Sequence, residues 1–124
     1  MNNLAEKIQN SELEIMKALW ENGGTLPLRE IWRIVSARCD WEYPTVKTLL
    51  RRLQAKEVVS LESRGVYRAL ISEEEYNTCS ARSFVDRVFS GSAKKLMAAL
   101  VSNGQLNEED IAELSELLNG EERP

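Results

Sequence analysis

The hydrophobic spacing of the chain changes part of the way along, and this change constrains the fold more than any other feature. Up to about Lys56 the apolar residues recur at intervals of three and four, which is typical of helices. From Val58 to Ile71, two runs rich in β-forming residues flank the turn signal Ser63-Arg64-Gly65, which predicts a β-hairpin. Three helices followed by a two-stranded hairpin is the order of a winged helix-turn-helix domain.

Local signals mark the first two helices. Ser11 and Glu14 have the spacing of a capping box, in which each side chain binds the other residue's backbone N–H, so they predict a first helix over residues 11–22. Thr25-Leu26 is predicted to be a short extended piece. Pro27 suits the first turn of a second helix, where its missing N–H costs nothing.

The third helix, predicted over residues 43–56, has one apolar and one polar face. Because a helix rotates by about 100° per residue, one side of it carries Val46, Leu49, Leu50 and Leu53, and the polar residues lie on the opposite side. The polar face carries hydroxyls and cations, which can pair with phosphate or contact base edges in the major groove. A cation in the hairpin turn can reach the backbone or the minor groove. The predicted DNA-binding residues are Thr45, Lys47, Thr48, Arg51, Arg52 and Arg64.

Two other interpretations of this polar face remain open from the residues alone. A solvated helix surface also favours Lys and Arg. A winged-helix module that binds proteins and never touches DNA is the alternative function, but it would carry acidic or apolar residues where this chain has Lys47, Arg51 and Arg52. The hairpin directly after the helix favours DNA binding.

Charge is divided unevenly along the chain, although the net charge is -4. Residues 29–68 hold nine basic and five acidic side chains, whereas residues 69–124 hold five basic and eleven acidic ones. This asymmetry is expected when one part of a chain meets phosphate and another does not. A solvated surface of uneven charge would give the same counts.

The last third of the chain is predicted to form short amphipathic helices that are too small to fold alone. Their apolar faces must cover the first domain or meet a second copy. We expect the second copy, because a two-fold dimer doubles the phosphate contacts and places two half-sites about one turn of DNA apart. The fold is therefore mainly α with a small β-hairpin, as a winged-helix domain over residues 1–71 and a helical dimerisation region over 72–124. The predicted dimerisation residues are Tyr76, Phe84, Val88, Leu96, Leu100, Ile111, Leu114, Leu117 and Leu118.

The composition argues against catalysis and metal binding. The chain has no histidine, which removes the commonest general base, and it has no Gly-rich phosphate loop. Cys39 and Cys79 are expected to be reduced packing thiols, with a regulatory disulfide or metal site as the alternative. We expect no enzyme activity, cofactor or structural zinc. No membrane helix or signal-peptide pattern is seen, so a cytoplasmic location without membrane insertion is expected.

Four segments, taken in order, resemble the BlaI/MecI/CopY family of penicillinase, methicillin-resistance and copper-responsive repressors. They are residues 10–20 (NSELEIMKALW), Trp41 with residues 45–53 (TVKTLLRRL), residues 71–76 (ISEEEY) and residues 83–87 (SFVDR). The resemblance implies a homodimeric repressor that binds a palindromic operator of an antibiotic-resistance operon of the β-lactamase type. It places the residues matching Thr45, Lys47, Thr48 and Arg51 at double-stranded DNA.

The same resemblance implies a route of induction. In the β-lactam branch, a membrane sensor-protease detects the drug and the repressor is cut in its C-terminal region between Asn and Phe. Ala99 and Leu100 stand at that place here, which makes them the candidate cleavage site. The Cys-x-Cys pairs of the copper-responsive branch are missing from the C-terminal tail, and Glu57 stands where the family has a glycine that ends the third helix.

Overall fold

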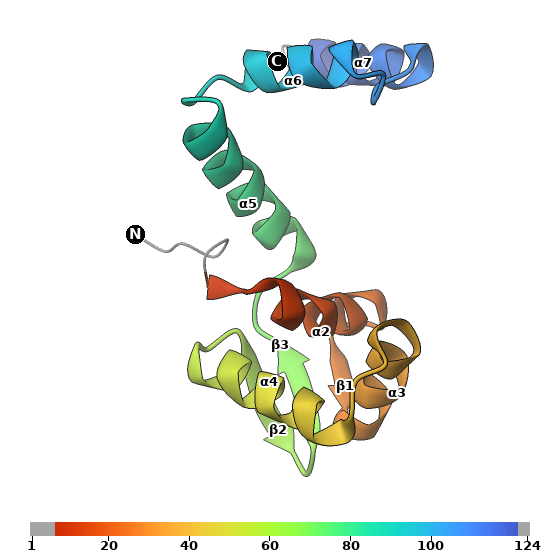
Figure 1. Cartoon of the computed structure of the whole chain (residues 1–124), viewed down its shortest axis with the longest axis vertical. Helices are drawn as coiled ribbons and strands as arrows, with labels where there is room; N and C mark the ends of the chain where they lie inside the picture. Colours follow the sequence, from red (N-terminus) through yellow and green to blue (C-terminus); the bar gives the residue numbers. More distant parts are fainter. Residues whose placement is uncertain (1–6, 122–124) are drawn as a thin grey trace. The chain divides into compact units, whose positions relative to one another are not determined.

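The computed structural model describes residues 7–121, as two compact units. The first unit ends at Ala81 and the second begins at Arg82, within one helix (Figure 1). Residues 1–6, which entered the expectation of a cytoplasmic location, lie outside the described part. Within that part, no helix is long and apolar enough to cross a membrane.

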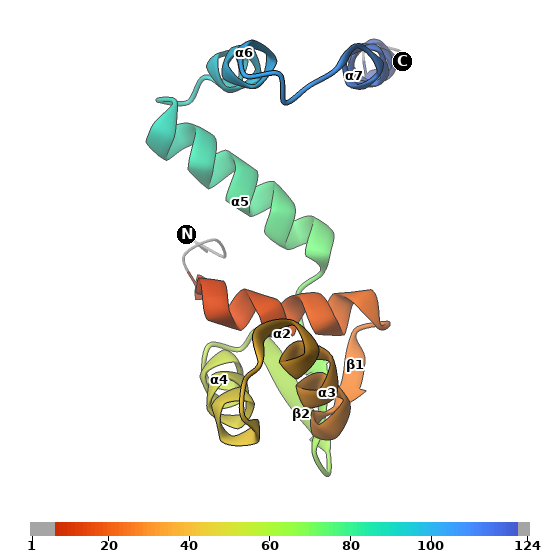
Figure 2. The same ribbon diagram turned by 45° about the vertical axis from the view of Figure 1, so that its right-hand side comes forward.

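The first unit is a winged helix. Its helices are α2 (Asn10–Glu21), α3 (Leu28–Cys39) and α4 (Tyr43–Ala55), and its strands are β1 (Thr25–Pro27), β2 (Val59–Ser63) and β3 (Val66–Ala69). Helix α2 packs against both α3 and α4, and the β2–β3 turn projects away from α2 (Figures 1 and 2). The mainly helical fold with a small antiparallel sheet confirms the prediction.

The sheet has one strand more than the predicted hairpin. Its order is β1-β3-β2, so the extended piece at Thr25 and Leu26 becomes an edge strand, with Leu26 opposite Tyr67. Short-range spacing could not show this pairing, because it joins segments far apart in the chain. The added strand ties the start of α3 to the hairpin.

The core of the first unit lies between the three helices and the sheet. The predicted apolar face of α4 is buried, with Val46, Leu50 and Leu53 fully inaccessible to solvent. They form one apolar cluster with buried side chains of α2, α3 and the sheet. These buried partners are Ile15, Met16 and Leu19 of α2, Ile31 and Val35 of α3, and Val58, Val59 and Tyr67 at the sheet.

The capping box predicted for the first helix is wrong in its register. Helix α2 begins at Asn10, which leaves Ser11 inside it, and the Glu12 carboxylate accepts the backbone N–H of Gln9 at 3.0 Å. The Glu12 carboxylate also pairs with Lys56, with 2.6 Å between Oε1 and Nζ, and this contact favours the earlier start. A second capping box forms between Ser72 and Glu75, with bonds of 2.9 and 3.0 Å.

The exit from α4 uses a residue that seldom takes the required conformation. Glu57 has φ 64°, in the left-handed region that glycine adopts most easily. The N–H of Val58 donates to the Leu53 carbonyl at 2.9 Å and that of Glu57 to the Gln54 carbonyl at 3.0 Å, which is the Schellman pattern of helix ends. The chain therefore makes the turn expected of glycine, with a glutamate.

The second unit contains the end of α5 (Glu73–Val88), α6 (Ala93–Ser102) and α7 (Glu108–Glu121). Ser90 and Gly91, both with positive φ, end α5. The last helix is capped by Asn107, whose side-chain oxygen accepts the Asp110 N–H at 2.7 Å. None of the described side chains from residue 82 onward is buried.

Candidate DNA interface

The predicted DNA-binding residues of α4 share one exposed face. The rotation of the helix places this face opposite its buried leucines, so the hydrophobic core itself fixes which side of α4 meets solvent. All five side chains are exposed, namely Thr45, Lys47, Thr48, Arg51 and Arg52. The two threonines are short, which leaves room for a close approach of the duplex.

Arg64 lies in the turn between β2 and β3, where it is exposed. The next residue, Gly65, has φ 62°, and its carbonyl accepts the backbone N–H of Leu28 at 2.6 Å. This bond fastens the turn to the start of α3. The wing is therefore held to the helix-turn-helix at its turn, and Arg64 is next to the anchored residue.

The structure separates the cations that are engaged within the first unit from those that are not. Four of the nine basic residues in 29–68 form ion pairs: Arg33 with Glu30, Arg38 with Glu21, Lys56 with Glu12 and Arg68 with Glu62. Within residues 7–121, the other five have no ion pair. These five are Arg29, Lys47, Arg51, Arg52 and Arg64. Four of them belong to the predicted site, so the charge available to phosphate is concentrated on α4 and the wing.

The pairing of Glu62 keeps an acidic group on the wing from acting as an isolated charge. Its carboxylate accepts hydrogen bonds from the Ser60 hydroxyl and from Arg68, the latter at 3.1 Å. The Ser60 hydroxyl first, and then Arg68, lower the pKa of Glu62 below its usual value. Glu62 thus stays ionised at neutral pH, with a guanidinium beside it.

Tyr43 is a candidate contact that the sequence analysis missed. It is the first residue of α4, it is 41% exposed, and its ring meets Trp32 edge to face with 5.7 Å between centroids. Trp32 is fixed in turn because its Nε1 donates to the Trp41 carbonyl at 3.1 Å. The N-terminal residues of a recognition helix contact base edges. An aromatic residue at the first position of the basic helix was the signal available in the sequence.

The predicted dimerisation residues divide between the two units. Tyr76 belongs to the first unit, where its ring lies 5.7 Å from that of Trp20. In the second unit, Leu117 and Leu118 are the most exposed, at 65% and 66%. Phe84, Val88 and Ile111 are also exposed, and Leu96, Leu100 and Leu114 are half-buried.

The candidate cleavage residues Ala99 and Leu100 lie inside helix α6 and are half-buried. Their backbone groups take part in helical hydrogen bonding, since the Ala99 carbonyl accepts the N–H of Asn103 at 3.1 Å and the Leu100 carbonyl that of Gln105 at 2.9 Å. A protease binds its substrate in an extended form, so this turn of α6 must open before it can be cut.

The fold, with an exposed cationic face on its third helix and an anchored wing, is that of a winged-helix DNA-binding protein. The family model described as penicillinase repressor matches residues 8–120. The chain belongs to this family of transcriptional repressors, as its resemblance to BlaI/MecI/CopY proteins predicted.

Individual relatives match over nearly the whole length. The penicillinase repressor of Bacillus licheniformis is 30% identical over 115 residues, which cover 90% of this chain and 89% of the relative. The methicillin resistance regulatory protein MecI of Mammaliicoccus sciuri is 26% identical over 122 residues, covering 96% and 98%. The penicillinase repressor of Staphylococcus aureus is 26% identical and covers 96% of both chains.

Proposed function

We propose that this protein represses an antibiotic-resistance operon of the β-lactamase type by binding a palindromic operator as a homodimer. Helix α4 enters the major groove and the wing contacts the adjacent backbone. The observation that carries this proposal is the exposed face of α4, whose cations Lys47, Arg51 and Arg52 have no ion pair within residues 7–121. The names of the relatives support the operon class.

The proposed dimer interface lies in the second unit. Exposed apolar patches of this kind mark association surfaces in soluble proteins. Leu117 and Leu118 lie side by side on α7, and Phe84 and Val88 are one helical turn apart on α5. A second copy would cover these side chains, and it would double the number of phosphates that the protein engages.

Proteolytic relief by a membrane sensor-protease is the induction route that we propose. Cleavage at Ala99-Leu100 would separate α7 and part of α6 from the rest of the chain. The dimer would then lose apolar contacts, and the operator would be released. Because the bond lies in a helix, the proposal requires local unfolding of α6 before cleavage.

A binding experiment with matched variants tests the DNA contact. Duplexes are selected by the full chain from a random-sequence pool, and affinity is measured by fluorescence anisotropy. Arg51→Ala should weaken specific binding by about 1–3 kcal/mol if Arg51 contacts a base, and added salt should weaken all binding steeply. Lys17→Ala, which removes one exposed positive charge from α2, is the control and should change affinity little.

Three outcomes would contradict the DNA proposal. A selection that yields no common sequence would show that binding is not specific. Equal losses in Arg51→Ala and Lys17→Ala would show that α4 is not the contact surface. A chain that binds no duplex but still folds would favour the protein-interaction module instead.

Sedimentation of the full chain tests the dimer separately. Leu117→Glu should convert the dimer to a monomer, because it places a charge in the proposed apolar interface. Glu116→Gln on the same helix is the control, since that side chain is exposed and already polar. A Leu117→Glu variant that stays dimeric would place the interface elsewhere.

A further inference from the structure

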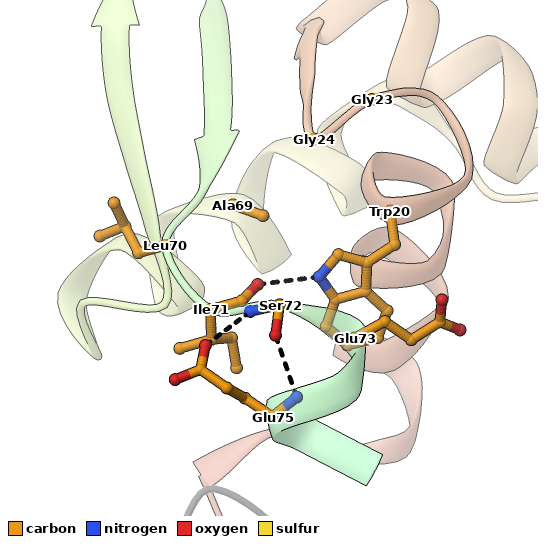
Figure 3. A pocket seen from close by; sticks show the side chains of 9 residues that line it. All are labelled: Trp20, Gly23, Gly24, Ala69, Leu70, Ile71, Ser72, Glu73 and Glu75. Atoms are coloured by element: carbon orange, nitrogen blue, oxygen red, sulfur yellow. Dashed lines mark hydrogen bonds between the residues drawn. The ribbon is translucent and has the colours of Figure 1, made fainter.

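The last residue of β3 and the two residues that follow it are each hydrogen-bonded to another part of the winged helix. The N–H of Ala69 donates to the Gly24 carbonyl and that of Leu70 to the Val58 carbonyl, both at 2.8 Å. The Ile71 carbonyl accepts Nε1 of Trp20 at 2.9 Å (Figure 3). Residues 69–71 are therefore held by the strand pairing and by Trp20.

Ser72 continues the connection directly into α5. Its N–H and its hydroxyl exchange two hydrogen bonds with Glu75, at 2.9 and 3.0 Å, as Figure 3 shows. This capping box starts the helix at the next residue, Glu73. Only residues 70–72 therefore separate β3 from α5.

Trp20 contacts both the residues after β3 and the first turn of α5, which together form the joint between the winged helix and α5. Besides binding Ile71, its ring packs against Tyr76 in the first turn of α5, with 5.7 Å between the ring centroids and 37° between the planes. Ile71 and Tyr76 are partly buried against the core of the first unit. The first turns of α5 thus belong to the winged helix, and they continue into the helix that carries Phe84 and Val88.

We expect a joint with these contacts to be stiffer than a free tether, and this has a consequence for any dimer that α5 helps to form. A flexible tether would let each winged helix search for its own half-site, so the dimer would accept several spacings. A fixed joint allows both half-sites to be engaged only where their separation matches the protein, and the gain from two-site binding is lost elsewhere.

We propose that Trp20 is a positioning residue, which fixes the direction of α5 on the winged helix and thereby sets the half-site spacing that the dimer accepts. This inference rests on the proposed function. The ligand that it specifies is a duplex with two half-sites at one spacing. Trp20 acts through Ile71 and Tyr76 and does not itself contact DNA.

The test measures the full chain on a series of duplexes. The selected operator is changed by inserting or deleting two base pairs between its half-sites, which rotates one half-site by roughly 70° about the DNA axis. The variants are Trp20→Phe, which removes the Nε1 donor, and a Ser-Gly insertion after Ile71, which loosens the joint without touching the core. Trp32→Phe is the matched control, because it removes the other tryptophan bond of the first unit, to the Trp41 carbonyl.

The expected result is a change in the spacing profile. The wild-type protein should lose about 100-fold in affinity on the altered operators, because only one half-site can then be engaged. Trp20→Phe should lose roughly tenfold and the insertion variant less than tenfold. Trp32→Phe should keep the wild-type ratio between operators, whatever its effect on overall affinity, and all variants should bind an isolated half-site.

Each other outcome overturns a different statement. A Trp20→Phe variant and an insertion variant with the wild-type profile would show that the joint does not set the spacing. A wild-type protein that tolerates all spacings would also overturn the inference, but it would not contradict the proposed function as a repressor. Failure of the wild-type protein to select any operator would instead contradict the proposed function.

Discussion

Glu12 and Lys56 form an ion pair that joins the start of α2 to the end of α4, with 2.6 Å between Oε1 and Nζ. Glu12 is fully buried, and its second oxygen has no hydrogen-bond partner within the described residues. The Lys56 ammonium also donates to the Lys7 carbonyl at 2.6 Å, and the Lys7 ammonium to the Lys56 carbonyl at 3.1 Å. The segment before α2 is thus fastened to the residue that follows α4.

Removing one member of this pair should destabilise the protein more than removing both. Lys56→Met leaves the Glu12 carboxylate buried without its cation, which costs about 3 kcal/mol of unfolding free energy, whereas Glu12→Met with Lys56→Met should lose much less. Urea unfolding of the full chain measures both. Equal losses of unfolding free energy in the single and double variants would show that the unpaired carboxylate does not cause the destabilisation.

Replacing Glu57 by glycine should stabilise the protein. Glu57 has φ 64°, and a left-handed conformation costs a residue with a Cβ roughly 1–2 kcal/mol. Glycine removes this cost, but it also raises the conformational entropy of the unfolded chain, which offsets part of the gain. We expect a net gain of about 0.5–1 kcal/mol for Glu57→Gly in the same unfolding experiment. Glu57→Ala keeps the strain and removes only the charge, so a similar gain in that control would refute the conformational explanation.

Truncating the inner face of α4 should cost far more than truncating an exposed leucine. Leu50 is fully buried, so Leu50→Ala should lower the unfolding free energy by about 2–5 kcal/mol. Leu61 on β2 is 47% exposed, and Leu61→Ala should cost less than about 1 kcal/mol. Losses of similar size at the two positions would be inconsistent with the packing described for α4.

The Tyr43 hydroxyl is expected to contact the operator. Tyr43→Phe keeps the ring against Trp32 but removes one hydrogen bond to DNA, which is worth about 1 kcal/mol, or roughly a fivefold loss of affinity. Anisotropy on the selected duplex measures the change, with Tyr67→Phe, at a buried tyrosine of β3, as the control. Unchanged affinity in Tyr43→Phe would place this hydroxyl outside the interface.

Cys39 should react more slowly than a free thiol. Burial raises the pKa of the Cys39 thiol, and the Glu14 carboxylate adds to this rise, so less thiolate is present at any given pH. In a Cys79→Ser variant, the midpoint of the alkylation rate against pH should lie above that of a cysteine in a short unstructured peptide under the same conditions. A midpoint at or below that of the peptide cysteine would contradict the assigned environment.

Patterns within short stretches determined much of the fold in advance. The spacing of Val46, Leu49, Leu50 and Leu53 predicted which face of α4 is buried, and the turn at Gly65 predicted the hairpin. The Ser72–Glu75 box likewise joins two residues three positions apart. These features depend on residues a few positions apart, whose geometry is set by the helix or strand in which they lie.

The register of the first helix and the extra strand could not be predicted in this way. Glu12 lies two residues before the glutamate of the predicted box, and its bond to Lys56 joins residues that are 44 positions apart in the sequence. Thr25 and Leu26 pair with β3 only because α2 and α3 pack so as to bring them there. Both outcomes depend on contacts between distant segments.

The site divides in the same way. The sequence by itself determined that α4 carries a cationic face, because the helical rotation follows from residue order alone. Only the tertiary structure decided which cations remain available, since the partners of Arg38, Lys56 and Arg68 lie on other elements or across a turn. It also decided that Trp20 meets Ile71 and Tyr76, because a side chain finds such distant partners only when the chain has packed.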